Sequence, residues 1–297
     1  MFKFFGKSLR NETVKKLLEL RNTMVDQLKA VYRENESIAL VNTLLYRVAG
    51  VDKTEIILHP EMTIDEGLMI ELNQKFNELM NFKPVQYVTG KASFFDLELK
   101  VSPAVLIPRP ETEELAKWII DDNKSSEGLK ILDIGTGSGC IILAIGKFLT
   151  DPILTAVDIS EEALEMASHN ANELHIPVFF DRFNILDENQ WGRMGHYDII
   201  VSNPPYVRES EKALMQPNVL NFEPSAALFV PDDDALVFYR VIARFARLHL
   251  EPGGTLYLEI NENLGREMVE LLQSEGFIKI ALRKDLQGKD RMVVCKL

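Results

Sequence analysis

The sequence predicts an α/β protein in which a sheet of parallel strands carries helices on both faces, preceded by a small helical bundle and a β-hairpin linker. Beyond Glu111, apolar runs of strand length alternate with helix-length segments, a pattern typical of such a sheet. Before about residue 82, apolar residues recur at helical spacing instead. We therefore expect a helical domain at residues 1–83, a hairpin linker at 84–110 and an α/β domain at 111–297.

The first part is expected to be helical from residue 11 to about 82. In "VKKLLELRNTMVDQLKAV" the apolar residues share one helical face: Val14, Leu17, Leu18, Met24, Val25 and Leu28. The segments "SIALVNTLLYRVAG" and "IDEGLMIELNQKFNELMNF" continue the pattern between polar turns. A small bundle that binds a partner protein and takes no part in catalysis is the expected structure.

The linker and the α/β domain follow in order. Between residues 83 and 108, apolar and polar residues alternate, and Gly90 and several prolines interrupt them, which predicts a hairpin. Strands are expected at 130–135, 153–160, 178–186, 197–203, 255–260, 278–284 and 291–297. Helices are expected at 140–149, 161–174, 235–250 and 266–277.

Composition limits the class of protein. Of 297 residues, 46% are hydrophobic and 26% charged, as in a soluble globular protein with a substantial core. The two cysteines, Cys140 and Cys295, and the five scattered histidines have no disulfide-framework or metal-site spacing, so neither is expected. The N-terminus becomes charged too soon for a signal peptide, and Lys147 interrupts the most apolar run. We expect a cytoplasmic protein that does not enter a membrane.

The net charge of −12 is unevenly distributed. Residues 1–90 contain 12 basic and 12 acidic residues, whereas the remainder contains 21 basic and 33 acidic residues. Surfaces that bind duplex nucleic acid need basic patches for the phosphates. Nucleic acid is therefore not the expected partner.

A glycine loop follows the first strand of the α/β domain. In "DIGTGSG", Gly135, Gly137 and Gly139 permit a sharp turn and a close approach of the backbone to a ligand. Asp158 closes the next strand, where its carboxylate can accept hydrogen bonds from ribose hydroxyls. Thr136 and Ser138 complete the loop.

Asp133 distinguishes between two kinds of ligand for this loop. A dinucleotide-binding loop places a pyrophosphate at the helix N-terminus, and an acidic residue just before the glycines would repel it. The same acid suits a cationic ligand that carries an amino group. S-adenosyl-L-methionine has a sulfonium and an ammonium, so the residues favour it over a nicotinamide nucleotide.

The segment "SNPPYV" follows the strand at 197–203 and should lie at the same sheet edge. The side-chain carbonyl of Asn203 can accept one N–H of a planar amine or amide, and the backbone carbonyl of Pro204 can accept the other. Pro205 stiffens the turn, and Tyr206 offers an aromatic face. Two fixed acceptors would favour charge building on nitrogen as it attacks a sulfonium methyl group. No strong general base is evident.

These motifs resemble the HemK/PrmC family of class I methyltransferases, which modify the glutamine of the Gly-Gly-Gln motif in class I peptide-chain release factors. The similarity covers nearly the whole chain and includes "IPRPETE", "DIGTGSG", "VDIS", "SNPPYV", "FEPSAAL", "LEPGG" and "DLQGKDRMVV". It implies a Rossmann-like fold, S-adenosyl-L-methionine as cofactor and S-adenosyl-L-homocysteine as product. "IPRPETE" is the most discriminating stretch, because adenine-N6 methyltransferases share NPPY.

The resemblance also implies roles for single residues. Asp133, the loop from Gly135 to Gly139 and Asp158 would contact the cofactor, with Trp191 beside the adenine. Residues 203–206 would hold the glutamine amide. Arg109 and Glu111 would form either part of the active-site rim or an ion pair that pins the linker.

The chain departs from the family pattern at two positions where glycine is common. These are Asn261, after "LEI", and the vicinity of Val230. Both positions are expected to be peripheral to the amide pocket.

Three other functions remain open. A glutamine methyltransferase of a ribosomal protein would carry the same motifs. An adenine-N6 methyltransferase would use the NPPY turn on a flipped base, although the acidic α/β domain argues against it. A catalytically silent adapter would keep the helical domain as a binding module and would not bind the cofactor.

Overall fold

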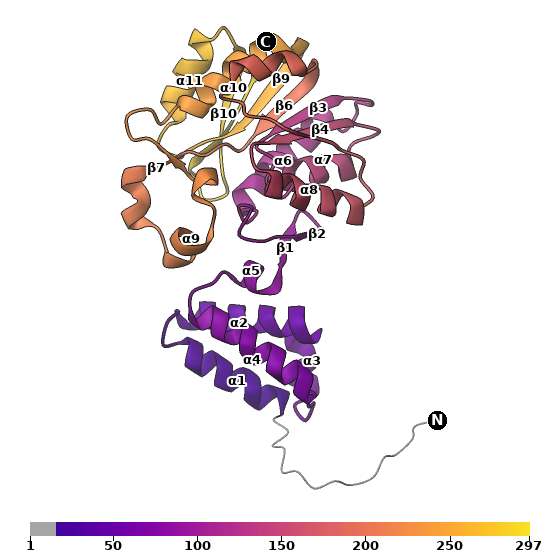
Figure 1. Cartoon of the computed structure of the whole chain (residues 1–297), viewed down its shortest axis with the longest axis vertical. Helices are drawn as coiled ribbons and strands as arrows, with labels where there is room; N and C mark the ends of the chain where they lie inside the picture. The colour runs from indigo at the N-terminus through magenta and orange to yellow at the C-terminus, as the bar shows by residue number, and fades with distance from the viewer. Residues whose placement is uncertain (1–15) are drawn as a thin grey trace. The chain divides into compact units, whose positions relative to one another are not determined.

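The computed structural model describes residues 16–297 and divides the chain into two compact units between Thr89 and Gly90 (Figure 1). Among these residues, no helix combines the length and the apolar character needed to cross a membrane. Cys140 and Cys295 are buried free thiols.

The first unit is a helical bundle, as the apolar spacing predicts. Its core contains Leu17, Met24, Val25 and Leu28, while Val14 lies outside the described residues. Asp52 begins one helix with a capping box that Glu55 completes. The helices are α1 (Leu17–Leu28), α2 (Glu34–Ala49), α3 (Lys53–Leu58), α4 (Glu66–Met80) and α5 (Val85–Thr89).

The second unit opens with an antiparallel hairpin of β1 (Lys91–Phe94) and β2 (Leu97–Lys100). A seven-stranded sheet follows, in the order β10-β11-β9-β6-β3-β4-β5. Its strands are β3 (Lys130–Ile134), β4 (Ile153–Asp158), β5 (Phe179–Arg182), β6 (Tyr197–Ser202), β9 (Leu250–Glu259), β10 (Ile278–Lys284) and β11 (Asp290–Lys296). The remaining elements of this unit are α6 (Pro110–Asn123), α7 (Cys140–Phe148), α8 (Glu161–Glu173), η1 (Glu188–Arg193), β7 (Val207–Arg208), η2 (Glu209–Leu214), α9 (Pro217–Phe222), η3 (Ser225–Ala227), β8 (Phe229–Val230), α10 (Val237–His249) and α11 (Gly265–Ser274).

The sheet corrects the prediction in one respect, because it is mixed and not purely parallel. Strands β5, β4, β3, β6 and β9 run parallel, whereas β11 lies antiparallel between β9 and β10. The short turn between β10 and β11, closed by a hydrogen bond from Asp285 N to Lys289 O, can join only antiparallel neighbours. Apolar content alone does not reveal this direction.

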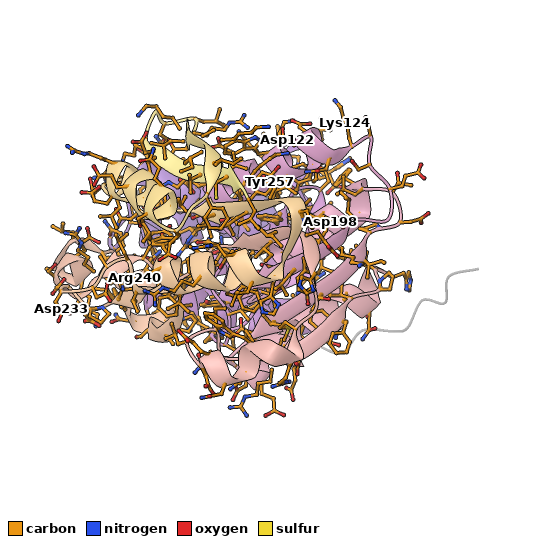
Figure 2. All side chains as sticks on the ribbon, turned by 90° about the horizontal axis from the view of Figure 1, so that it is seen from above. Asp122, Lys124, Asp198, Asp233, Arg240 and Tyr257 are labelled. Carbon is orange, nitrogen blue, oxygen red and sulfur yellow. The ribbon has the colours of Figure 1, made fainter. Side chains whose placement is uncertain are left out.

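Helices cover both faces of the sheet, and the strand alternation assigns residues to each face. Ile131 and Ile199 pack with α6 and α7, whereas their neighbours Leu132 and Ile200 pack with α10 and α11. On the face that α6 covers, the Tyr257 hydroxyl of β9 donates to Asp122 of α6 at 2.9 Å (Figure 2). The apolar residues packed on the two faces hold the parallel strands together. The carboxyl ends of these strands form one edge of the sheet.

A buried amide on α8 ties the hairpin to the glycine loop. Asn170 accepts from Lys100 N at 2.8 Å, and its amide donates to Lys100 O at 3.0 Å and to Ser138 O at 2.9 Å. Because the side chain is 2% exposed, water cannot replace these bonds. Asn170 thus fixes the backbone of the glycine loop from outside the loop.

We predict that Asn170→Asp lowers the free energy of unfolding by roughly 2–3 kcal/mol, because two buried carbonyls lose their donor and face a carboxylate. Asn172→Asp, an exposed change on the same helix, should stay within about 0.5 kcal/mol of the wild type. Urea denaturation measures both. Equal effects of the two substitutions would contradict this role of Asn170.

Candidate active site

The glycine loop connects β3 to α7 at the carboxyl edge of the sheet. Gly135, Gly137 and Gly139 all have positive φ, at 74°, 55° and 81°. At Gly139 a Cβ would also lie 3.1 Å from Leu143 Cδ1, so both conformation and packing demand glycine there. At Gly135 and Gly137 a Cβ would meet open space, which leaves the inner side of the loop accessible to a ligand.

Asp133 immediately precedes this loop, and only one of its two carboxylate oxygens has a hydrogen-bond partner among the described residues. Oδ2 accepts from the Thr136 hydroxyl at 2.7 Å, whereas the buried Oδ1 has no partner among residues 16–297. Burial raises the pKa of Asp133 to about 7, and the nearby Asp158 contributes to the rise. The Ser138 hydroxyl is likewise buried without a partner in the described part of the chain. Such orphaned groups fit a ligand that brings its own donors, such as an ammonium.

Asp158 ends β4 and faces the glycine loop. Its Oδ2 accepts from Gly137 N at 3.0 Å and its Oδ1 from Ser160 N at 2.9 Å. Burial raises the pKa of Asp158, and these backbone bonds oppose the rise. The carboxylate therefore orders the loop, and its predicted contact with ribose hydroxyls stays a prediction.

Trp191 is a core residue of the second unit. It is 6% exposed, donates from Nε1 to Ile185 O at 2.9 Å and packs edge-on against Phe245. These contacts satisfy the indole without a ligand. Its predicted place beside an adenine stays a prediction.

The NPPY turn begins where β6 ends. The preceding Ser202 donates to Ile134 O at 2.7 Å, which ties the turn to the strand that carries Asp133. Pro204 is buried, while Asn203 and Tyr206 are half-buried. The Asn203 amide nitrogen donates to the Thr112 hydroxyl at 3.2 Å, and its Oδ1 has no partner among the described residues. This oxygen can therefore still accept a hydrogen bond, and its predicted contact with a substrate amide stays a prediction.

Two residues that the motif analysis missed complete the site. The carboxylate of Glu259, the last residue of β9, accepts from Thr112 at 2.7 Å and from the Tyr206 hydroxyl at 3.0 Å. Burial raises the pKa of Glu259, and burial also raises that of Tyr206. An acidic residue at the carboxyl end of an apolar strand, within "LYLEI", was the sequence signal that could have identified Glu259.

Asn261, which is expected to be peripheral to the amide pocket, contacts the backbone of the NPPY turn. Its amide donates to the backbone carbonyl of Tyr206 at 3.1 Å, and the side chain is 6% exposed. Asn261 reaches the turn because β9 and β6 are neighbours in the sheet. Val230 pairs with Arg208 in the β7–β8 ladder, two residues after the NPPY turn ends.

A small cavity of about 40 Å³ lies against Asn203 and Tyr206. Arg109 also lines it and donates to Glu223 at 2.6 Å, and the Glu223 side chain is 1% exposed. The ion pair considered for Arg109 therefore exists, but its acidic partner is Glu223 of "FEPSAAL" and not Glu111, which accepts from Gln287 at 3.4 Å. The other residues of the lining are Leu106, Val207, Ala227 and Leu228.

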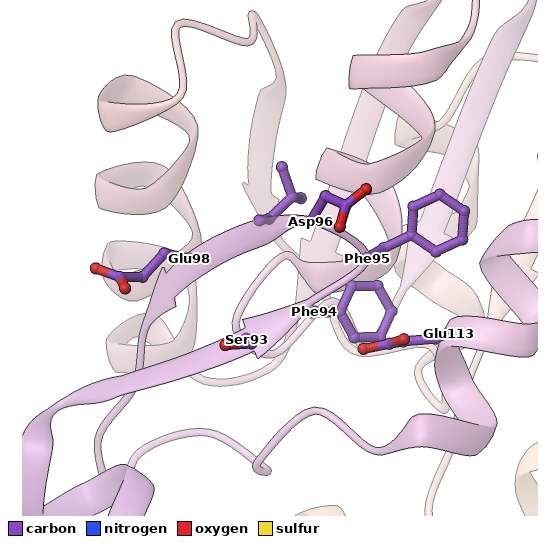
Figure 3. A pocket seen from close by; sticks show the side chains of 7 residues that line it. Ser93, Phe94, Phe95, Asp96, Glu98 and Glu113 are labelled. Carbon is purple, nitrogen blue, oxygen red and sulfur yellow. The ribbon is translucent and has the colours of Figure 1, made fainter. Parts of the chain in front are cut away.

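A larger, open cavity of about 610 Å³ lies at the hairpin and the start of α6 (Figure 3). Phe94, Phe95 and Asp96 from the hairpin and Glu113 from α6 line it (Figure 3). None of the predicted site residues belongs to its lining, so its size does not make it the active site.

The fold and the two motifs together define a class I methyltransferase. A glycine loop preceded by Asp133 and an Asn-Pro-Pro-Tyr turn both lie at the carboxyl edge of a seven-stranded sheet. A crystal structure of a methyltransferase from Pyrococcus furiosus shares this fold, with a TM-score of 0.50 and 19% identity, over 75% of this chain and 98% of that chain. Residues 115–221 match the family described as "Methyltransferase small domain", and residues 19–90 match "PrmC N-terminal domain".

Curated relatives define the family more narrowly. The release factor glutamine methyltransferase of Flavobacterium psychrophilum is 41% identical, over 92% of this chain and 96% of its own. That of Bacteroides thetaiotaomicron is 42% identical over 90% and 95%, and that of Streptococcus pneumoniae is 38% identical over 94% and 98%. The chain belongs to the release factor glutamine methyltransferase family.

Proposed function

We propose that this enzyme transfers a methyl group from S-adenosyl-L-methionine to the side-chain N5 of the glutamine in the Gly-Gly-Gln motif of class I peptide-chain release factors. The observation that carries the proposal is the small cavity at the NPPY turn, where Asn203 presents an amide oxygen without a partner among the described residues. The names of the curated relatives support the choice of substrate.

The cofactor site is proposed at the glycine loop. Asp133 Oδ1 would accept from the ammonium of the methionine portion, and Asp158 would accept from the ribose hydroxyls. Backbone and side-chain atoms of Thr136 and Ser138 would surround the ligand. When bound, S-adenosyl-L-methionine supplies an electrophilic methyl group on a sulfonium and leaves as S-adenosyl-L-homocysteine.

The substrate amide is proposed to lie in the cavity at the NPPY turn. Asn203 Oδ1 and the backbone carbonyl of Pro204 would each accept one N–H of the glutamine amide. Two fixed acceptors hold the nitrogen lone pair toward the methyl donor and stabilise the positive charge that builds on nitrogen. Tyr206 lines the cavity, and Pro205 would stiffen the turn beside it. The proton lost from nitrogen would pass to an acceptor of the site or to water.

The size of the cavity favours an amide over adenine. A volume of about 40 Å³ accommodates about three water molecules, comparable to the three heavy atoms of a carboxamide and well below the ten of a purine. The excess of acidic residues beyond residue 90 also disfavours a nucleic-acid substrate. A ribosomal-protein glutamine would fit the same cavity, and the family membership favours a release factor.

The three parts of the chain receive proposed roles from this reaction. The helical domain at residues 1–83 would bind the release factor, the linker would span residues 84–110, and the α/β domain at 111–297 would carry out the transfer. Translation termination places such an enzyme in the cytoplasm. Neither nucleic acid nor a membrane is needed as a direct partner.

The direct test incubates the enzyme and S-adenosyl-L-methionine with a purified class I release factor, followed by mass spectrometry of its peptides. We expect one added methyl group on the Gly-Gly-Gln glutamine and none on a factor in which that glutamine is replaced by alanine. Ribosomal proteins in a parallel reaction provide the matched comparison. Methylation of a ribosomal protein with no methylation of the release factor would refute the proposed substrate.

A second prediction concerns cofactor affinity and pH. Since burial raises the pKa of Asp133 to about 7, this carboxyl is protonated in the free enzyme below pH 7 and must lose its proton to pair with an ammonium. Affinity for S-adenosyl-L-homocysteine should therefore be roughly tenfold weaker at pH 6 than at pH 8. Calorimetric titration measures it.

The control for this prediction is Asp133→Asn, which keeps the shape of the side chain but cannot titrate. It should bind S-adenosyl-L-homocysteine weakly at both pH values and lose the difference between them. A variant that retains the full pH dependence would show that another group, such as Asp158, is responsible.

A further inference from the structure

We infer that Thr112 and Glu259 are positioning residues that fix the Asn203 amide with its oxygen toward the substrate and its nitrogen away from it. The inference rests on the proposed function, because it explains how the acceptor of the glutamine amide is held. An asparagine side chain is nearly symmetric in shape, so packing alone cannot decide which end faces the cavity. A reversed amide would present a donor to the substrate N–H groups and repel them.

The direction of the hydrogen bonds settles the orientation. The Thr112 hydroxyl has a single proton, which it donates to Glu259 Oε2 at 2.7 Å. Its oxygen can then only accept from Asn203, and the Asn203 amide nitrogen lies 3.2 Å from it. The Asn203 amide is therefore fixed through Thr112 by a carboxylate that accepts hydrogen bonds and donates none.

The same carboxylate also holds Tyr206, another residue that lines the cavity. Glu259 Oε1 accepts from the Tyr206 hydroxyl at 3.0 Å, so both carboxylate oxygens are engaged by residues that touch the site. Glu259 is 1% exposed and Thr112 is 2% exposed, which keeps water from competing for these bonds. Burial raises the pKa of Glu259 and the charge of Glu111 adds to the rise, while the hydrogen bonds from Thr112 and Tyr206 and the guanidinium of Arg291 oppose it.

The test compares Thr112→Val, which keeps the shape but removes the hydroxyl, with Thr112→Ser, which keeps the hydroxyl. We expect Thr112→Val to lower kcat for release-factor methylation by roughly tenfold to a hundredfold, because the acceptor loses its fixed orientation. Its affinity for S-adenosyl-L-homocysteine should be unchanged, and Thr112→Ser should stay within about threefold of the wild type.

Thr255→Val provides a matched control, since Thr255 is buried on β9 outside the site. It should leave kcat unchanged, which separates the loss of a buried hydroxyl from the loss of this particular one. Thermal unfolding of all variants reports on their folding. If Thr112→Val does not fold, Thr112→Ala is measured in the same way. A loss of kcat is again expected, and an unchanged kcat would overturn the inference.

The outcomes distinguish the inference from the proposed function. A wild-type enzyme that does not methylate the release factor would refute the proposed function. A wild-type enzyme that methylates it, with Thr112→Val equally active, would overturn the inference and leave the function intact. Equal losses in Thr112→Val and Thr112→Ser would also overturn it, because the hydroxyl would not be the cause.

Discussion

The buried carboxylate of Glu259 is the constraint on which the geometry of the site depends. It ends β9 and accepts hydrogen bonds from α6, through Thr112, and from the NPPY turn, through Tyr206. Three segments that are distant in sequence therefore meet at one ionisable group. Removing an acceptor that serves two buried donors leaves both unsatisfied, so the arrangement tolerates little change.

Two acids at the same sheet edge have opposite roles, and their partners determine which role each has. Glu259 has both oxygens engaged by the protein, which makes it a structural support for the acceptor Asn203. Asp133 has one buried oxygen without a partner in the described part of the chain and a pKa raised to about 7. It is therefore suited to receive a cationic ligand group. Glu259 thus has both oxygens engaged by protein donors, whereas Asp133 keeps one oxygen without a partner among the described residues.

The sequence predicted the elements better than the contacts between them. Strands β3, β4 and β6 and the helices between them follow from apolar spacing, and the glycine loop and NPPY turn follow from local motifs. Glu259 was missed because it lies 147 residues from Thr112. Arg109 lines the same small cavity as Asn203, yet its partner Glu223, 114 residues away, was not identified. The antiparallel direction of β11 depends on a turn that apolar content does not report.

The most direct test of the hydrogen-bond network is a double-mutant cycle between Thr112 and Asn203, with release-factor methylation as the readout. If Thr112 acts by orienting Asn203, Thr112→Val should reduce kcat in the wild-type background and cause little further loss in the Asn203→Ala background. The same factor of loss in both backgrounds would show that the two residues act independently, and would contradict the account.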